Sequence, residues 1–140
     1  MTLRIATVAD IQEMQRVRRS VLENRLSDPS RVTDEHCREM LEERGRGWVY
    51  ETAGHIAGFA IADNTARSIW ALFVEPGYEG QGIGRALHDA MLDWLFEVGN
   101  SPLWLTTDPN TRAARFYVSA GWTAEPQPHH GELRFTRDRR

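Results

Sequence analysis

The chain has 140 residues, which are enough for one globular domain with a sizeable core and too few for two domains. Its 17 basic residues are all arginine, so Schiff-base chemistry and a P-loop lysine are excluded, and the net charge of −3 argues against general binding to nucleic acid. One cysteine excludes an internal disulfide and a cysteine-rich zinc site. No apolar run approaches the roughly 18 residues of a membrane span, and the N-terminus does not read as a signal peptide. We therefore expect a single cytoplasmic domain over residues 1–140, with no metal, membrane or nucleic-acid partner.

The N-terminal part of the chain shows a strand pattern followed by two helix patterns. Residues 3–5 alternate apolar and polar side chains, which is typical of a strand. Asp10 is the expected N-cap of a first helix, whose apolar positions follow helical spacing: Ile11, Met14, Val17, Val21 and Leu22. After a loop, Thr33 is the expected N-cap of a second helix that carries Cys37 on its apolar side.

The middle of the chain predicts three strands and then an amphipathic helix. The strands are expected at 48–52, 55–63 and 68–74, and the first two are joined by a short hairpin signal. From Ile83 to Val98 the apolar residues recur with the spacing of a helix, and Gly99 is the expected C-cap.

The C-terminal part predicts one more strand, one more helix and two closing strands. Leu103 to Thr107 is interpreted as a strand, and the apolar spacing over 113–120 indicates a helix that ends at Gly121. Short strands are expected at 122–124 and 133–136. The order β-α-α-β-β-β-α-β-α-β-β predicts a mixed α/β domain.

A glycine-rich segment connects the strand that ends at Val74 to the helix that starts at Ile83. Gly80, Gly82 and Gly84 allow the backbone to approach a ligand closely and to adopt positive φ. The amides here lie at a helix N-terminus, where unpaired N–H groups and the helix dipole attract an anion. The segment is therefore either a phosphate or pyrophosphate site or simply a tight connection.

Two other glycine-rich motifs do not fit this segment. A Walker loop requires a lysine after its last glycine, and the chain has none. In a Rossmann fingerprint, the third glycine would fall on Leu87 or on Arg85, depending on the register.

Two motifs together resemble a known family, the GNAT superfamily of N-acetyltransferases. The segment Val74-x-Pro76-x-x-x-Gly80-Gln81-Gly82-Ile83-Gly84 is similar to its acyl-CoA-binding signature, Gln/Arg-x-x-Gly-x-Gly/Ala. The segment Asn110-x-x-Ala113-x-x-Phe116-Tyr117-x-x-x-Gly121-Trp122 resembles its later motif, in which an Asn precedes a helix that carries a Tyr and ends in Gly-aromatic. The resemblance implies a GNAT-like α/β fold: a mostly antiparallel sheet of six to seven strands, with a splayed parallel pair and about four flanking helices.

The resemblance also implies acetyl-CoA as co-substrate, with its pantetheine arm entering between the strands 68–74 and 103–107. The residues expected to bind it are Phe73, Val74, Gln81, Gly82, Ile83, Gly84, Arg85, Asn110, Ala113, Phe116 and Tyr117. The backbone N–H of Val74 would polarise the thioester carbonyl, or else it is an ordinary ladder donor. Tyr117 would be the general acid that protonates the leaving thiolate, or else a core aromatic.

One position departs from the family pattern, because Glu79 stands where the signature has Gln or Arg. A carboxylate there would repel a pyrophosphate, so we expect Glu79 to point to solvent while Gln81 and Arg85 face the phosphates. The surrounding stretch 51–100 is itself acidic, with two arginines against seven acids. Arg112 and Arg115 are expected on a solvated helix face, with the cofactor's phosphates as the alternative.

The acceptor is expected to be the primary amine of a small molecule, with a peptide N-terminus as the alternative. The candidate acceptor-site residues are Arg18, Glu23, Asp28 and Trp70. Arg18 falls inside the apolar arc of its helix, so it either pairs at the margin of the core or binds an anionic group of the substrate. Glu75 is interpreted as a turn residue, and the base is left open among Glu23, Asp28, His130 and a water chain.

The leading functional hypothesis is an N-acetyltransferase in which the amine attacks the thioester directly within a ternary complex. Neither motif contains a cysteine, so a covalent acyl-enzyme is disfavoured. The alternatives are a catalytically weak acyl-CoA binding or sensing module, and a structural domain without a CoA site. A homodimer that pairs the closing strands within 122–136 is also compatible with the sequence.

Overall fold

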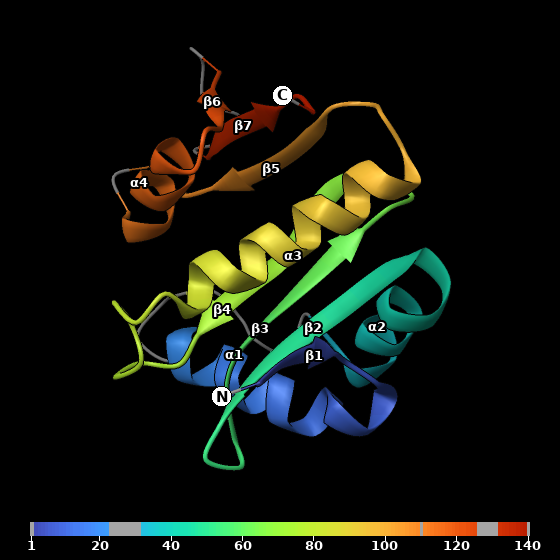
Figure 1. Ribbon diagram of the computed structural model, residues 1–140, viewed down its shortest axis with the longest axis vertical. Coiled ribbons are helices and arrows are strands. Elements are labelled where there is room, and N and C mark those ends of the chain that lie inside the picture. Colours follow the sequence, from blue (N-terminus) through green and yellow to red (C-terminus); the bar gives the residue numbers. More distant parts are fainter. Residues whose placement is uncertain (1, 23–31, 110, 126–131, 140) are drawn as a thin grey trace.

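The computed structural model describes residues 2–22, 32–109, 111–125 and 132–139, and it places a seven-stranded sheet at the centre of the fold (Figure 1). The strand order is β1-β2-β3-β4-β5-β7-β6, and every pair is antiparallel except β4 with β5. The elements in chain order are β1 (Thr2–Ile5), the 3-10 turn η1 (Val8–Asp10), α1 (Ile11–Leu22), α2 (Asp34–Glu39), the π-helical turn η3 (Met40–Arg44), β2 (Gly45–Thr52), β3 (His55–Asp63), β4 (Ser68–Val74), α3 (Ile83–Val98), β5 (Leu103–Thr107), α4 (Arg112–Ser119), β6 (Thr123–Ala124) and β7 (Leu133–Arg137). The expected mixed α/β fold with one parallel pair is confirmed.

Helices cover both faces of the sheet because strand side chains alternate between the faces. On one face, α1 packs on a core formed by Met14, Val17, Val49, Phe59 and Ile61. On the other face, α3 packs on a larger core that also contains aromatic residues of the C-terminal part; its members include Trp48, Leu87, Met91, Leu95, Tyr117, Trp122 and Phe135. None of the helices in the described part of the chain combines the length and apolarity required for a membrane span.

The parallel pair β4 and β5 is joined at one end only. The register has a single pair, Ser68 with Trp104, where the Trp104 backbone N–H donates to the Arg67 carbonyl at 3.1 Å. The Trp104 indole N–H reinforces this point by donating to the Ala66 carbonyl at 2.8 Å. Beyond it the strands diverge, so the sheet has two parts, β1 to β4 and β5 with β7 and β6 (Figure 1).

Two expected element starts differ from the structure by three residues. The N-cap before α1 is Thr7, since a 3-10 turn precedes the helix and its capping box pairs Thr7 with Asp10. Asp10 therefore closes the cap from three residues later, accepting a hydrogen bond from the Thr7 N–H at 2.8 Å. Strand β2 begins at Gly45 instead of residue 48, because the missing side chain permits close pairing with β3: a Cβ there would lie 1.7 Å from the Ala62 carbonyl oxygen. The expected N-cap at Thr33 is confirmed.

Asp10 is predicted to stabilise the fold through its side chain. Its carboxylate is almost buried and accepts two hydrogen bonds of 2.9 Å from Arg4 besides the Thr7 N–H. Asp10→Ala should lower the free energy of unfolding by about 1–3 kcal/mol in urea titrations. Glu13→Ala is the matched control, since this exposed carboxylate pairs with Arg16 one turn away, and its loss should cost less than about 0.5 kcal/mol.

The stabilisation that the Asp10 carboxylate provides should decrease as the pH falls. Hydrogen bonds from Arg4 hold the pKa of Asp10 below its usual 3.8. The unfolded chain therefore binds the proton first, and this part of the stability is complete above the unfolded pKa and is lost as the pH falls through the folded one. Equal unfolding energies for the Asp10 and Glu13 variants at neutral pH would contradict the assignment.

Candidate active site

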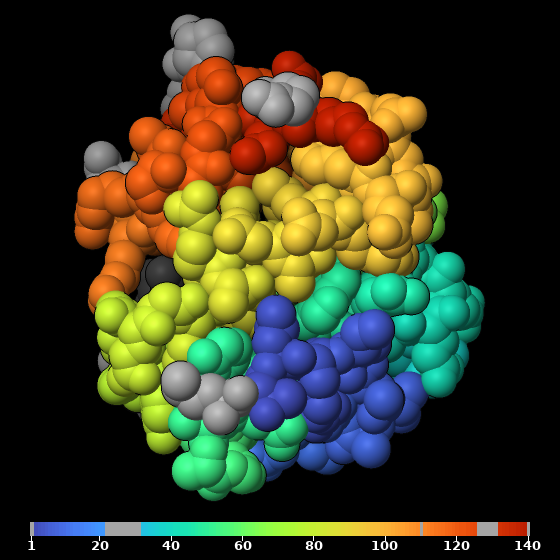
Figure 2. Space-filling model, viewed as in Figure 1, coloured from blue at the N-terminus to red at the C-terminus, as the bar shows by residue number. Residues whose placement is uncertain are grey.

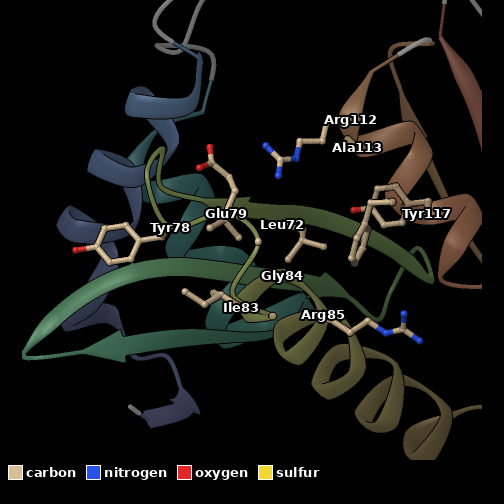
Figure 3. A pocket seen from close by; sticks show the side chains of 13 residues that line it. Leu72, Tyr78, Glu79, Ile83, Gly84, Arg85, Arg112, Ala113 and Tyr117 are labelled. Carbon is tan, nitrogen blue, oxygen red and sulfur yellow. The ribbon is translucent and has the colours of Figure 1, made fainter.

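A cavity of about 420 Å³ lies where β4 and β5 have separated. Its walls come from the end of β4, the loop that precedes α3, the first turn of α3 and one side of α4 (Figure 3). Figure 2 shows the surface hollowed between that loop and α4. The lining residues are Leu72, Val74, Tyr78, Glu79, Gly80, Gly82, Ile83, Gly84, Arg85, Arg112, Ala113, Phe116 and Tyr117.

A β-bulge in β4 determines which of its residues face the cavity. β3 pairs Ile61 with Ala71 and Ala62 with Ile69, so Trp70 is an extra residue in β4. An extra residue reverses the alternation of the strand from that point onward.

Beyond the bulge, the backbone of β4 presents two donors to the open seam. The Glu75 N–H donates to the Ala57 carbonyl of β3 at 2.8 Å, and the direction of ladder hydrogen bonds alternates along a strand. The N–H groups of Leu72 and Val74 therefore point away from β3, toward the side where β5 has separated. Both residues line the cavity, so the sequence reasoning that selected Val74 missed a second donor at Leu72.

The loop before α3 has the backbone that an anion site requires. Gly77, Gly80 and Gly82 all have positive φ, at 97°, 77° and 84°. A Cβ at Gly80 or Gly82 would meet nothing within 4 Å, so the backbone there is uncovered. Gly82 is the N-cap of the 16-residue helix α3, whose first-turn amides have no partner within the helix and open on the cavity. These features fit a phosphate or pyrophosphate group.

Glu79 is exposed, as expected, but it also lines the cavity. The turn at Gly77 directs its N–H to the Glu79 carboxylate at 2.8 Å, and backbone hydrogen bonds from Glu79 itself and from Gly77 lower the pKa of this carboxyl. Arg112 faces Glu79 across the mouth of the cavity (Figure 3) and does not lie on a purely solvated face. Arg85 lines the cavity as expected, whereas Gln81 is exposed and is not one of the lining residues.

Tyr117 combines the two interpretations that the sequence left open. Its ring is 7% exposed and packs against Phe116, Trp122 and Phe135, with ring centroids 5.3, 5.6 and 6.2 Å away. Its hydroxyl points into the cavity (Figure 3). Burial raises the pKa of Tyr117, so the phenol is protonated across the neutral range.

Glu75 anchors the start of the glycine loop. Its carboxylate forms an ion pair with Arg16 of α1 and lies 3.1 Å from the His55 Nε2 through each oxygen. Burial acts to raise the pKa of Glu75, but the hydrogen bonds from Arg16 and His55 outweigh it and leave the pKa lowered. His55 also stacks on Tyr78, a residue of the cavity wall, at 5.7 Å. Glu75 is therefore more than the turn residue inferred from the sequence.

Phe73, expected to contact the cofactor, is not one of the lining residues of the cavity. The reversed alternation places this ring on the α1 face of the sheet, 5.6 Å from Phe59 and under the Arg18 guanidinium at 5.9 Å. Trp70 packs against the same core. Arg18 is half-buried, and burial lowers its pKa. These residues therefore lie across the sheet from the cavity.

Several expected residues cannot be placed in the site. Glu23, Asp28, Asn110 and His130 lie outside the described residues. Within the described ranges, no three His, Cys, Asp or Glu side chains gather as metal ligands would. The sequence missed Leu72, Tyr78 and the inward position of Arg112, and only the β4 register, which depends on the bulge, reveals Leu72.

Several known acetyltransferases are similar in sequence to part of this chain. Rice (Oryza sativa subsp. japonica) "Serotonin N-acetyltransferase 2, chloroplastic" is 29% identical over 116 residues, which cover 78% of this chain and 56% of the relative. The Escherichia coli K12 "[Ribosomal protein bS18]-alanine N-acetyltransferase" is 35% identical over 72 residues, 49% of each chain. The chain thus spans about half the length of these relatives, and it spans only 25% of soybean (Glycine max) "Histone acetyltransferase TAP1".

The fold and a family model lead to the same assignment. The PaiA N-acetyltransferase of Thermoplasma acidophilum, solved in complex with coenzyme A, superposes with a TM-score of 0.79 over 99% of both chains at 13% identity. Residues 9–122 match the family model "Acetyltransferase (GNAT) family". Since that match covers most of the chain, the protein belongs to the GNAT acetyltransferase family.

Proposed function

We propose that this protein is an acetyl-CoA-dependent N-acetyltransferase that transfers the acetyl group directly to a primary amine of a small molecule. The observation that carries the proposal is the open β4 edge, whose Leu72 and Val74 donors share one cavity with the glycine loop and the Tyr117 hydroxyl. Acetyl-CoA supplies the acetyl group, whose bond to sulfur breaks while a bond to the amine nitrogen forms and the sulfur keeps the electron pair.

The cavity has the parts that acetyl-CoA needs. An unpaired strand edge suits the amides of a pantetheine arm in the way that it suits a further strand. The uncovered loop and the first turn of α3 suit the pyrophosphate, with Arg85 and Arg112 as its cations. The relative from T. acidophilum was solved with coenzyme A, which supports this choice of ligand.

Two groups of the chain would stabilise the charge that develops during transfer. The Leu72 and Val74 N–H groups are fixed donors for the thioester oxygen, and Leu72 is the one nearer to the closed end of the seam. Tyr117 would donate a hydrogen bond to the departing sulfur, which leaves as a thiolate and takes its proton from solvent. Its raised pKa makes a phenolate unavailable at neutral pH, so the group serves as a donor throughout.

Glu75 is not the base in this proposal. Arg16 and His55 already occupy its oxygens, and its lowered pKa makes it a weak proton acceptor. The proton of the acceptor ammonium must therefore leave through another group or through water.

The proposal also specifies the class of acceptor, a small-molecule amine instead of a protein. The names of two relatives give a small arylalkylamine, serotonin, and a protein alanine as acceptors of those proteins. We favour a small amine for this chain because residues 51–100 are net negative and residues 101–140 are net positive, so the sequence predicts no large single-sign groove for a protein tail. The second candidate function is an acyl-CoA sensing module, which the inward position of Glu79 favours.

A panel of amines should separate these functions. Thiol release from acetyl-CoA is expected with one or more small amines and not with a peptide whose N-terminal residue is alanine. Isothermal titration with acetyl-CoA runs in parallel. Tight binding without turnover on any amine would favour the sensing module, turnover on the peptide alone would overturn the acceptor class, and no binding would overturn the cofactor assignment.

Tyr117→Phe should lower kcat by a factor of about 10 to 100, because a hydrogen bond to a developing charge contributes ~1.5–3 kcal/mol. The acetyl-CoA Kd should change less than about twofold, since the ring and its packing are retained. The measurement is single-turnover acetylation with saturating amine, and Tyr50→Phe is the control because Tyr50 is not a residue of the cavity wall. An unchanged chemical rate in Tyr117→Phe would remove Tyr117 from the mechanism.

Glu79→Gln should tighten acetyl-CoA binding by about three- to tenfold at low salt, since it removes a carboxylate opposite the phosphates that costs ~1 kcal/mol in water. The gain should shrink at 0.5 M salt, where screening is stronger. Glu97→Gln, at the far end of α3 outside this cavity, makes the same change in net charge and should leave Kd unchanged. Weaker binding in Glu79→Gln would mean that the carboxylate helps to shape the loop.

A further inference from the structure

The feature that the proposed function leaves unused is a buried histidine between α3 and α4. His88 is in the middle of α3 and only 1% exposed. Its ring meets the edges or faces of three aromatic rings from the other side of the seam: Phe116 at 5.5 Å, Tyr117 at 6.4 Å and Trp122 at 6.2 Å. Two of these, Phe116 and Tyr117, line the cavity.

The hydrogen bonds of His88 determine its tautomer. The Trp122 indole N–H, which can only donate, lies 2.9 Å from the His88 Nε2, so that nitrogen must be unprotonated. The proton of the neutral ring is therefore on Nδ1, which lies 2.9 Å from the Asp89 carboxylate. Both ring nitrogens have complementary partners, and the ring cannot rotate without losing them.

The bond from Trp122 continues directly to Tyr117. The Trp122 backbone N–H donates to the Tyr117 carbonyl at 3.0 Å, and the two rings meet edge to face at 5.6 Å. α3 packs mainly on β2, β3 and β4, whereas Trp122 connects α4 to β6 in the other part of the sheet. The His88–Trp122 hydrogen bond thus spans the two parts of the molecule that β4 and β5 leave apart (Figure 1).

We propose that His88 is a positioning residue, which ties α4 to α3 across the open seam and holds the Tyr117 hydroxyl at its place in the cavity. The inference rests on the proposed role of Tyr117 for its catalytic consequence, but the tie itself is a property of the cofactor cavity. A proton on Nε2 would set two donors against each other and break the tie.

The surroundings of His88 favour the neutral ring. Burial lowers the pKa of His88, and the charged groups that face it are Asp89 and Arg85 of α3 and Arg137 of β7. Asp89 raises the pKa of His88, whereas the two arginines lower it. Because the folded pKa lies below the usual 6.5, the tie is intact at neutral pH and opens as the pH falls through that lower value. Below pH 6.5 the unfolded chain takes up the proton first, so stability also declines there.

Three variants test the tie. His88→Phe removes the acceptor and leaves the Trp122 N–H buried without a partner, so kcat should fall roughly tenfold and acetyl-CoA Kd should rise several-fold. His88→Gln retains an acceptor that does not titrate, so kcat should return to within about twofold of the parent and the acid limb of the pH–rate profile should disappear. Trp104→Phe is the matched control, since it removes another indole hydrogen bond, at the closed end of the seam, and should leave the pH profile unchanged.

A double-mutant cycle tests whether His88 acts through Tyr117. In the Tyr117→Phe background, His88→Phe should lower kcat by less than about twofold further, because the positioned hydroxyl is already absent. Full additivity of the two losses, or an unaltered acid limb in His88→Gln, would overturn the positioning role. If His88→Phe does not fold, Trp122→Phe, which removes the donor of the same hydrogen bond, replaces it in the cycle, and the acid limb of His88→Gln is still measured.

A measurement without catalysis separates this inference from the proposed function. In ¹⁵N-histidine NMR of the parent, with His88→Gln for assignment, the His88 signals should show a protonated Nδ1 and an unprotonated Nε2 at pH 7.5. The opposite tautomer, or an acetyl-CoA Kd unchanged in His88→Phe, would contradict the tie even if the enzyme acetylates amines. The predicted tautomer and Kd change in a protein that turns over no amine would support the tie and contradict the proposed function.

Discussion

The unpaired edge of β4 is the constraint on which the rest of the structure depends. Backbone N–H groups inside a protein are costly when they lack partners, and β5 supplies partners at one position only, Ser68 with Trp104. The donors left over at Leu72 and Val74 are compatible with a stable fold because they face a cavity that admits water or a ligand. A pantetheine arm would accept hydrogen bonds from these donors as a neighbouring strand does. The site therefore lies within the sheet, at the position where β4 has no paired strand on its β5 side.

The same constraint explains why the aromatic residues concentrate at the seam. Two parts of a sheet that share one bridge need other contacts to keep a fixed separation, and here α3 and α4 supply them through His88, Trp122 and the rings around Tyr117. At the other end of the seam, Trp104 closes the gap by its indole hydrogen bond to the Ala66 carbonyl. The width of the cavity therefore depends on a small number of polar contacts inside apolar packing, which is where single substitutions have large effects.

The sequence predicted the strands β3, β4 and β5 with the bounds that the structure has, because each is an apolar or alternating run between turn residues. It also located the glycine loop on the correct connection. It did not indicate the faces on which Phe73 and Leu72 lie, because the bulge at Trp70 has no local sequence signal and yet decides the face of every later β4 residue. The sequence did not indicate that Glu79 lines the cavity, because the direction of this side chain depends on a hydrogen bond from a positive-φ glycine, Gly77. His88 fits its helix as an ordinary core position, and its partner Trp122 is 34 residues away.

The charge distribution then limits how the cofactor is captured. The stretch 51–100 contains the glycine loop and carries two arginines against seven acids, so its long-range field repels an anionic ligand. Attraction must come from groups that act over a few ångströms, namely the first-turn amides of α3 and two arginines that line the cavity, Arg85 and Arg112. Asp89 competes for Arg85 at 3.2 Å, and Glu79 faces Arg112. The net charge of the protein is therefore a poor guide to its affinity for the cofactor. The affinity depends on the direction of a few backbone dipoles, and on whether Arg85 and Arg112 exchange their contacts with Asp89 and Glu79 for contacts with a pyrophosphate.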